Sequence, residues 1–329
     1  MDEVFPVRVP VPDLRDVAAG NAGIPGVWHL DSGRPGPRVV IVSLMHGNEF
    51  QGASVLARWL RAGLRPARGA LTLVFANLDA FSRFDPADPT LSRYVDEDLN
   101  RVWSPALLDG GRDSLEMRRA RALRPVVEAA EVLLDLHSML WPSDPVMIVG
   151  RDPAALALAR AAGAPPPIVV DGMRPEGPRL IDHAPFAVPG TGRLALLVEA
   201  GQHWEPETEM VAEACASGLL RALGMLPPAA PVGSEARGEV WTEVWPEVWT
   251  VSGCVVAASR GFCFTRPFRG GAVIPRAGTL IARDGEAEIR TPHDDCMLVM
   301  PSPRVMRGHV AVRLARRAPP GRGVQVTPG

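Results

Sequence analysis

The sequence contains no lysine, and this absence limits what its charges can indicate. All 35 basic residues are arginine, and 37 acidic residues bring the net charge to −2. No global field therefore draws the chain to nucleic acid or to an anionic membrane. With 34 prolines and 32 glycines beside them, the arginines follow a general composition bias, so each has to be argued from its position.

Cysteine and long apolar runs are also scarce. The four cysteines, Cys215, Cys254, Cys263 and Cys296, form no CxxC pair, which excludes a zinc knuckle and predicts small buried side chains. No run reaches the roughly 18 apolar residues that a membrane span needs. Because the N-terminus is acidic and interrupted by proline, we expect no secretory signal, and we expect a cytoplasmic protein with reduced thiols.

Buried strands and helices alternate through the first two thirds of the chain. Short apolar runs predict strands at 38–45, 71–76, 131–136, 145–149, 167–170 and 194–199. Helices are predicted at 51–63, 114–130, 153–162 and 207–223, and a loop at 85–98. This alternation predicts an α/β fold with a mostly parallel, doubly wound sheet flanked by helices.

The pattern changes after residue 225. Residues 226–238 are rich in proline, glycine and alanine, which predicts a linker after a catalytic domain at 1–225. Short β-like runs then predict a small β domain at 239–317, followed by a disordered tail at 318–329. The EVW triplet occurs three times at 239–249, and this repeat is either a local duplication or an exposed tryptophan surface.

The segment His46-Gly47-Asn48-Glu49 directly follows the first predicted strand. Zinc binds imidazole nitrogen and carboxylate oxygen, and a catalytic zinc usually has three protein ligands. A histidine and a glutamate three residues apart in a strand-to-helix turn can converge on one ion, and Gly47 allows the tight turn. Alone, such a pair is as consistent with two unrelated surface side chains.

His137 ends another predicted strand, within Asp135-Leu136-His137. Ligands of open α/β sheets bind beyond the carboxyl ends of the strands, so His46 and His137 are expected at one sheet edge. Together with Glu49 they predict a zinc site. Asp135 lies on the same strand face as His137 and either orients its imidazole or is a structural buried carboxylate.

Two further signals supply candidate catalytic groups. Glu199 ends the apolar strand 194–199, either where that strand reaches water or as a base aimed into the same cleft. Arg93, Asn100 and Arg101 stand in an otherwise acidic loop. Arginine and asparagine can hold a carboxylate or an oxyanion, although without context the segment would be a solvated charged loop.

Four motifs follow one another along the chain: HGNE at 46–49, RYVDEDLNR at 93–101, DLHS at 135–138 and EAGQ at 199–202. Together they resemble the succinylglutamate desuccinylase/aspartoacylase family, which is related to the zinc carboxypeptidases. The resemblance covers most of residues 38–205 and, more loosely, the C-terminal β region. It implies a carboxypeptidase-like α/β domain with a β domain that leans over the cleft and limits substrate size.

The resemblance also implies a role for each candidate residue. One Zn²⁺ per chain would be bound by His46, Glu49 and His137. The remaining matches are Glu199 with the general acid/base, Arg93 with the arginine that polarises the scissile carbonyl, and Asn100 and Arg101 with the pair that holds the carboxylate of the acylated amino acid.

The chain departs from the family pattern in its substrate contacts. Its only tyrosine is Tyr94, so the tyrosine that aspartoacylases supply from the C-terminal domain is absent. Arg174 and Arg179 are the candidates for the arginine that grips the acyl carboxylate. His183 and His203 are either cleft residues or incidental polar residues.

These signals predict a zinc-dependent deacylase that cleaves the amide bond of a small N-acyl amino acid or a related N-acylated amine. The alternatives are a zinc carboxypeptidase acting on peptides, a catalytically silent metal- or ligand-binding homologue, and a protein that associates through the tryptophan-rich segment. Neither nucleic acid nor a membrane is expected as a partner, and a homo-oligomer stays open.

Overall fold

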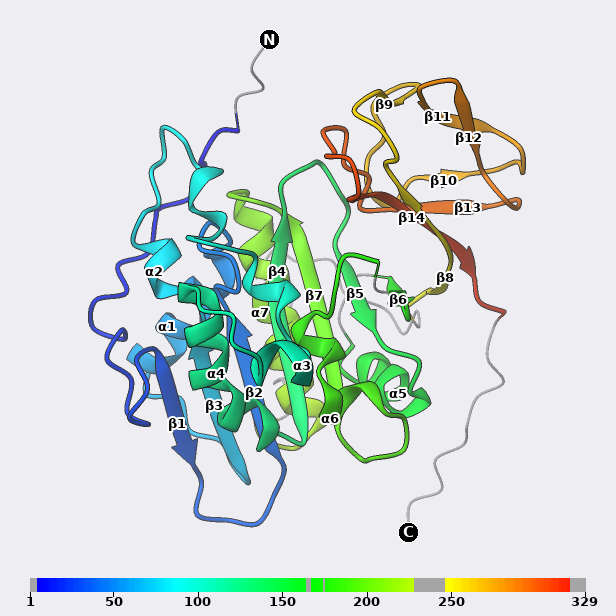
Figure 1. Cartoon of the computed structure of the whole chain (residues 1–329). Helices are drawn as coiled ribbons and strands as arrows, with labels where there is room; N and C mark the ends of the chain where they lie inside the picture. The colour runs from blue at the N-terminus through cyan, green and yellow to red at the C-terminus, as the bar shows by residue number, and fades with distance from the viewer. Residues whose placement is uncertain (1–4, 164–166, 174, 228–245, 320–329) are drawn as a thin grey trace.

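The computed structural model describes residues 5–163, 167–173, 175–227 and 246–319 (Figure 1). Within them an eleven-stranded sheet runs in the order β1-β3-β2-β4-β7-β5-β6-β8-β14-β13-β10. Its first seven strands in chain order are β1 Val27–Asp31, β2 Arg38–Ser43, β3 Ala70–Phe75, β4 Val132–Met139, β5 Val146–Val149, β6 Ile168–Val170 and β7 Leu194–Gln202. The α/β expectation is confirmed, with a sheet of mixed direction.

Four adjacent strands of this sheet, β3, β2, β4 and β7, are parallel to one another. β2 pairs in parallel with β3 and β4, and β4 pairs in parallel with β7. β1 and β5 join β3 and β7 in antiparallel fashion. The parallel pairing brings the carboxyl ends of β2, β4 and β7 to one edge of the sheet, as the positions of His46, His137 and Glu199 require.

Helices cover both faces of the central strands. The helices are α1 Gln51–Arg61, α2 Leu78–Phe81, α3 Pro105–Leu108, α4 Leu115–Glu128, α5 Pro153–Ala161, α6 Ala184–Ala187 and α7 Pro206–Ala222, with 3₁₀ turns η1 Leu91–Arg93, η2 Leu99–Arg101 and η3 Leu180–Asp182. Val39 and Ile41 of β2 pack into one core with α1, α5 and α7. The alternate residues Val40 and Val42 pack into a second core with α3 and α4. A strand buried on both faces explains the continuous apolar runs in the sequence.

The C-terminal region continues the sheet. Its strands are β8 Val248–Val256, β9 Phe262–Phe264, β10 Val273–Ile274, β11 Leu280–Asp284, β12 Ala287–Arg290, β13 Cys296–Val299 and β14 Val310–Arg317. β8 pairs in parallel with β6, and β14 pairs with β8. A separate three-stranded sheet, β12-β11-β9, lies at the far end of this region (Figure 1).

Several sequence expectations fall on parts of the chain that the structure does not describe. They are most of the linker at 226–238, the EVW repeat as far as residue 245, and the tail from residue 320. The end of the repeat, Val248-Trp249-Thr250, opens β8, and Trp249 is fully buried there. The expected loop at 85–98 contains the short turn η1. In the described part of the chain no helix is long and apolar enough to cross a membrane.

Candidate metal and catalytic site

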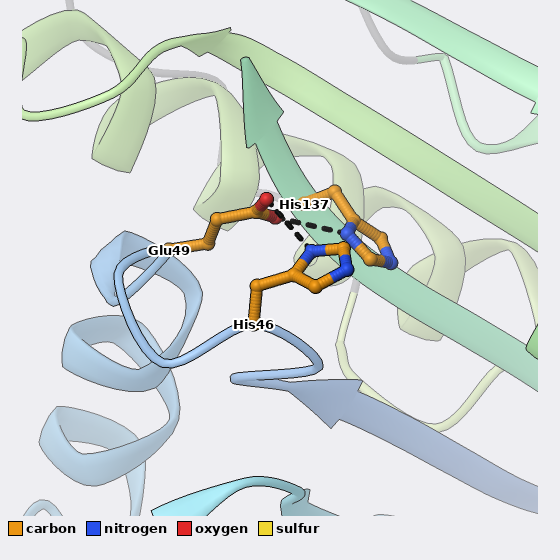
Figure 2. Close-up of side chains that lie close together, drawn as sticks. All are labelled: His46, Glu49 and His137. Atoms are coloured by element: carbon orange, nitrogen blue, oxygen red, sulfur yellow. Dashed lines mark hydrogen bonds and ion pairs between the residues drawn. The ribbon is translucent and has the colours of Figure 1, made fainter. Parts of the chain in front are cut away.

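Three buried side chains meet where β2 and β4 end. His46 lies in the turn after β2, Glu49 lies just before α1, and His137 lies in β4. Nδ1 of His46 is 2.8 Å from Oε1 of Glu49, and Nδ1 of His137 is 2.9 Å from Oε2 of the same carboxylate (Figure 2). One ligand atom from each residue lies within 4.8 Å of the others, so the three can hold a single metal ion.

Close packing, more than an unusual backbone angle, accounts for the glycine in the His46–Glu49 turn. A Cβ at Gly47 would lie 2.4 Å from the carbonyl carbon of Ala80 and 2.5 Å from the carbonyl oxygen of Ser92. The N–H of Gly47 also donates to the carbonyl oxygen of Arg93 at 3.0 Å. The residue with the left-handed backbone is Leu44, at φ 56°, where the chain leaves β2. Because Gly47 has no side chain, the turn formed by residues 46–49 can pack directly against the segment that carries Arg93.

Each imidazole is placed between two carboxylates. Nε2 of His46 is 2.9 Å from Oδ1 of Asp98. Nε2 of His137 is 2.9 Å from Oδ2 of Asp135, an ion-pair contact without the alignment of a hydrogen bond, since neither oxygen of that buried carboxylate accepts one from the described residues. Burial acts to raise the pKa of Glu49, but the two imidazoles outweigh it and hold that pKa well below its ordinary value.

Glu199 lies on the neighbouring strand β7, beside the cluster formed by His46, Glu49 and His137. In the parallel pairing of β4 with β7, His137 and Glu199 are register partners. Glu199 is 7% exposed, and its Oε2 is buried without a hydrogen-bond partner among the described residues. Burial raises the pKa of Glu199 to about 8, and the charge of Glu49 adds to the shift while His137 and Arg93 oppose it. A carboxyl group in this environment can exchange a proton near neutral pH.

Arg93 reaches the same cluster from η1. Its guanidinium donates to Oε1 of Glu49 at 3.1 Å and to Oδ2 of Asp98 at 3.2 Å, and it lies 2.9 Å from Nε2 of His46. Asp98 therefore contacts both His46 and Arg93, and its Oδ1 also accepts the N–H of Asn100 at 2.8 Å. The sequence motif contained Asp98, but only the fold shows this role, because 52 residues separate it from His46.

A buried glutamate of α4 anchors the loop that carries these groups. Glu116 is 1% exposed, and its carboxylate accepts the backbone N–H groups of Val95, Asp96 and Glu97 at 2.7, 3.0 and 3.2 Å. It also accepts from the side chain of Asn77 at 3.1 Å. Nothing local in the sequence distinguishes Glu116 from a surface helix residue, and sequence reasoning missed it.

The two residues predicted to hold a carboxylate are both at the site, but each already has protein partners. Oδ1 of Asn100 accepts the N–H of Leu180 at 2.8 Å, which turns its amide nitrogen toward Nε2 of His137 at 3.3 Å. Arg101 donates to Oε2 of Glu176 at 3.1 Å and to the carbonyl oxygen of Asn100 at 2.9 Å. Oε1 of Glu176 in turn accepts the N–H of Val310, at the start of β14.

The cluster opens into a pocket of about 200 Å³. Its lining combines the charged groups described above with the apolar side chains of Leu140, Trp141 and Ile148. The C-terminal region supplies Met300, Pro301, Ser302, Val310 and Arg313. The pocket is thus shaped by both parts of the chain, and its size suits a small molecule.

The remaining candidates have different surroundings. Arg174 lies outside the described residues. Arg179 lines the pocket, but its guanidinium is bound to Asp182 and Asp171. Tyr94 is 40% exposed and is not among the described residues that line the pocket.

His183 and His203, the two histidines for which the sequence left two interpretations, have different surroundings. His183 is fully buried against Trp103 and Glu128, and it is not among the described pocket residues. His203 is linked to the cluster through Ser138: its Nδ1 lies 2.7 Å from Oγ of Ser138, whose N–H donates to Glu49. Burial lowers the pKa of His203 to about 4, so its ring is neutral at pH 7.

A family model matches more than half of the chain. Residues 35–224 match the model of the succinylglutamate desuccinylase/aspartoacylase catalytic domain. A probable aspartoacylase from Parasynechococcus marenigrum is 37% identical over 135 residues, which are 38% of this chain and 42% of that protein. The human N-acyl-aromatic-L-amino acid amidohydrolase (carboxylate-forming) is 32% identical over 112 residues, 31% of this chain and 33% of that protein. The matched segment thus spans less than half the length of these relatives.

The similarity in fold extends further along the chain. The structure of a succinylglutamate desuccinylase from Vibrio parahaemolyticus superposes with a TM-score of 0.64 at 15% identity, covering 89% of this chain and 86% of that one. At this identity the likeness concerns the fold alone, and it includes the small C-terminal β region.

Proposed function

Because the chain belongs to the succinylglutamate desuccinylase/aspartoacylase family, we propose that it is a zinc-dependent amidohydrolase that cleaves the amide bond of a small N-acyl amino acid or a related N-acylated amine. The single observation that carries this proposal is the convergence of His46, Glu49 and His137 beside Glu199 in one pocket. The known relatives named above, described as aspartoacylases and as amidohydrolases of N-acyl amino acids, support the same reaction class.

The donor set suits zinc. Two imidazole nitrogens and a carboxylate are the ligands of many catalytic zinc sites. Asp98 lies where it can accept a hydrogen bond from Nε2 of His46, and the carboxylate of Asp135 lies 2.9 Å from Nε2 of His137, so an anion faces the ring nitrogen of each histidine that points away from Glu49. When bound, zinc would lower the pKa of water toward neutrality and polarise a carbonyl oxygen.

The chain's own residues would move the protons and stabilise the charge. Glu199 would take a proton from the attacking water and deliver it to the leaving nitrogen, so that the amide and water yield a carboxylic acid and an amine. Its raised pKa and its position beside His137 support this role. Arg93 would stabilise the negative charge that develops on the carbonyl oxygen.

We also propose that the catalytic unit is residues 1–225 and that the β region at 239–317 limits the size of the substrate. Met300, Pro301 and Val310 add apolar lining to the pocket, and its volume of about 200 Å³ favours a small N-acylated molecule over a polypeptide. Asn100 and Arg101 would hold the carboxylate of the acylated amino acid, with Arg101 exchanging its contact to Glu176 for the substrate.

Replacing Asp98 by asparagine is expected to weaken zinc affinity by roughly 10- to 100-fold, as other losses of a ligand-orienting carboxylate do. The change removes the anion that faces Nε2 of His46 and Arg93. Competition of the zinc-loaded protein with a chelator measures the effect. Asp88→Asn, an exposed change nearby, is the control. Equal zinc affinity in the wild type and Asp98→Asn would show that Asp98 does not orient the ligand.

A substrate panel tests the proposed reaction. The zinc-loaded protein is incubated with N-acetyl, N-succinyl and N-formyl amino acids and, in parallel, with short peptides, and the released amine is quantified. Release from at least one N-acyl amino acid at a higher kcat/KM than from any peptide is the expected result. Preferential release of C-terminal residues from peptides would instead make the chain a carboxypeptidase.

A further inference from the structure

Arg313 brings a cation from the C-terminal strand β14 to the wall of the pocket. Its side chain is only 12% exposed, so the guanidinium is largely removed from bulk water. A buried cation needs anionic or hydrogen-bonding partners to offset its lost hydration. The partners of the Arg313 guanidinium within the chain therefore indicate whether it is available to bind a ligand of the pocket.

Besides Arg93, three arginines of the described residues line the pocket, and their hydrogen bonds differ. Arg179 is engaged through Nε and both terminal nitrogens by Asp182 and Asp171. Arg101 is engaged through both terminal nitrogens by Asn100 and Glu176. Within the described part of the chain, no group accepts a hydrogen bond from the guanidinium of Arg313.

The one ion pair that Arg313 forms within the described residues involves Nε and leaves its two terminal nitrogens unoccupied. Nε lies 3.1 Å from Oδ2 of Asp171, too poorly aligned to count as a hydrogen bond. Asp171 is fully buried, and the same oxygen accepts from Arg179 at 3.1 Å. The carboxylate is thus shared between two guanidinium groups and compensates Arg313 only in part. Among the described residues, the two terminal nitrogens of Arg313 have no acceptor and form an open pair of donors.

We propose that Arg313 is a specificity-determining residue that binds a carboxylate of the substrate through its terminal nitrogens, an inference that rests on the proposed deacylase function. A guanidinium fork matches the two oxygens of a carboxylate, and the buried setting strengthens the pair. The side chains of Met300 and Val310, which also line the pocket, are apolar and offer no competing hydrogen-bond acceptor. The C-terminal region would then select the substrate by charge as well as by size.

The test compares substrates that differ by one carboxylate. The pairs are N-succinylalanine with N-butyrylalanine, N-acetylaspartate with N-acetylasparagine, and N-acetylalanine with N-acetylalaninamide. For the wild type, Arg313→Gln and the exposed control Arg316→Gln, kcat/KM is measured with the zinc-loaded full chain. In one pair we expect the wild type and the control to prefer the carboxylate by roughly 10- to 100-fold, and Arg313→Gln to lose that preference.

Equilibrium binding separates this inference from the proposed function. The same pairs are titrated calorimetrically into zinc-loaded Glu199→Gln protein, with and without Arg313→Gln, so that no turnover is required. A carboxylate preference that disappears with Arg313→Gln supports the inference even if every compound resists hydrolysis. Preferences that are equal in the presence and absence of Arg313 in all three pairs would overturn it, whatever the turnover.

Discussion

Replacing Glu199 by glutamine is expected to lower kcat by roughly 10²- to 10⁴-fold, the usual contribution of a general acid/base, while zinc content stays at that of the wild type. Glutamine keeps the volume of the buried side chain beside His137 but cannot accept and return a proton. Steady-state hydrolysis of the best N-acyl amino acid, with metal analysis of the same preparation, measures both quantities.

The exposed change Glu207→Gln on α7 is the matched control, because it makes the same chemical alteration away from the pocket. It should leave kcat, KM and zinc content unchanged. Near-normal turnover by Glu199→Gln would remove Glu199 from the proton transfer and direct attention to another group of the pocket. A loss of zinc in that variant would instead make Glu199 a part of the metal site.

Replacing His137 by alanine is expected to abolish stoichiometric zinc binding and, with it, hydrolysis. The change removes one of the three proposed ligands. It also leaves Asp135 and Glu49 as neighbouring buried carboxylates without the imidazole between them. Because uncompensated buried charge destabilises a fold, we further expect a lower free energy of unfolding in the variant. Metal analysis after dialysis and thermal unfolding measure the two effects.

Two companion variants separate metal loss from misfolding. His137→Gln keeps a polar side chain of similar reach and should also lose zinc, with a smaller loss of stability. His309→Ala, at an exposed histidine, should retain zinc and activity. Stoichiometric zinc in folded His137→Gln, bound as tightly as in the wild type, would contradict the proposed ligand set.

The parts of the fold and site that the sequence predicts are those encoded locally. The continuous apolar runs of β2, β4 and β7 predict strands buried on both faces, and the structure contains them. His46 and His137 each stand at the end of such a strand, so the topology of a parallel sheet is enough to bring them to one edge. Glu49 follows His46 by three residues within the same turn, so these two site residues are already close in the sequence.

The parts that the sequence does not predict depend on contacts between distant segments. Glu116 anchors the arginine loop from 19 to 21 residues away, and helical periodicity gives no sign of it. The sequence gives no sign that Arg101 has a partner within the chain. In the fold, Glu176, 75 residues further along, accepts a hydrogen bond from it. Arg313 is one of many arginines in a chain without lysine, and only the position of β14 brings it to the pocket.

The most direct test of the central claim combines zinc stoichiometry with reversible loss of activity. The purified full chain is analysed for metals, stripped with a chelator, and reloaded with zinc while amine release from its best N-acyl amino acid is followed. The account predicts one zinc per chain, loss of hydrolysis on stripping, and recovery as one equivalent is restored. Full hydrolysis by the stripped protein would contradict it, as would zinc that binds as tightly when His46, Glu49 and His137 are all replaced.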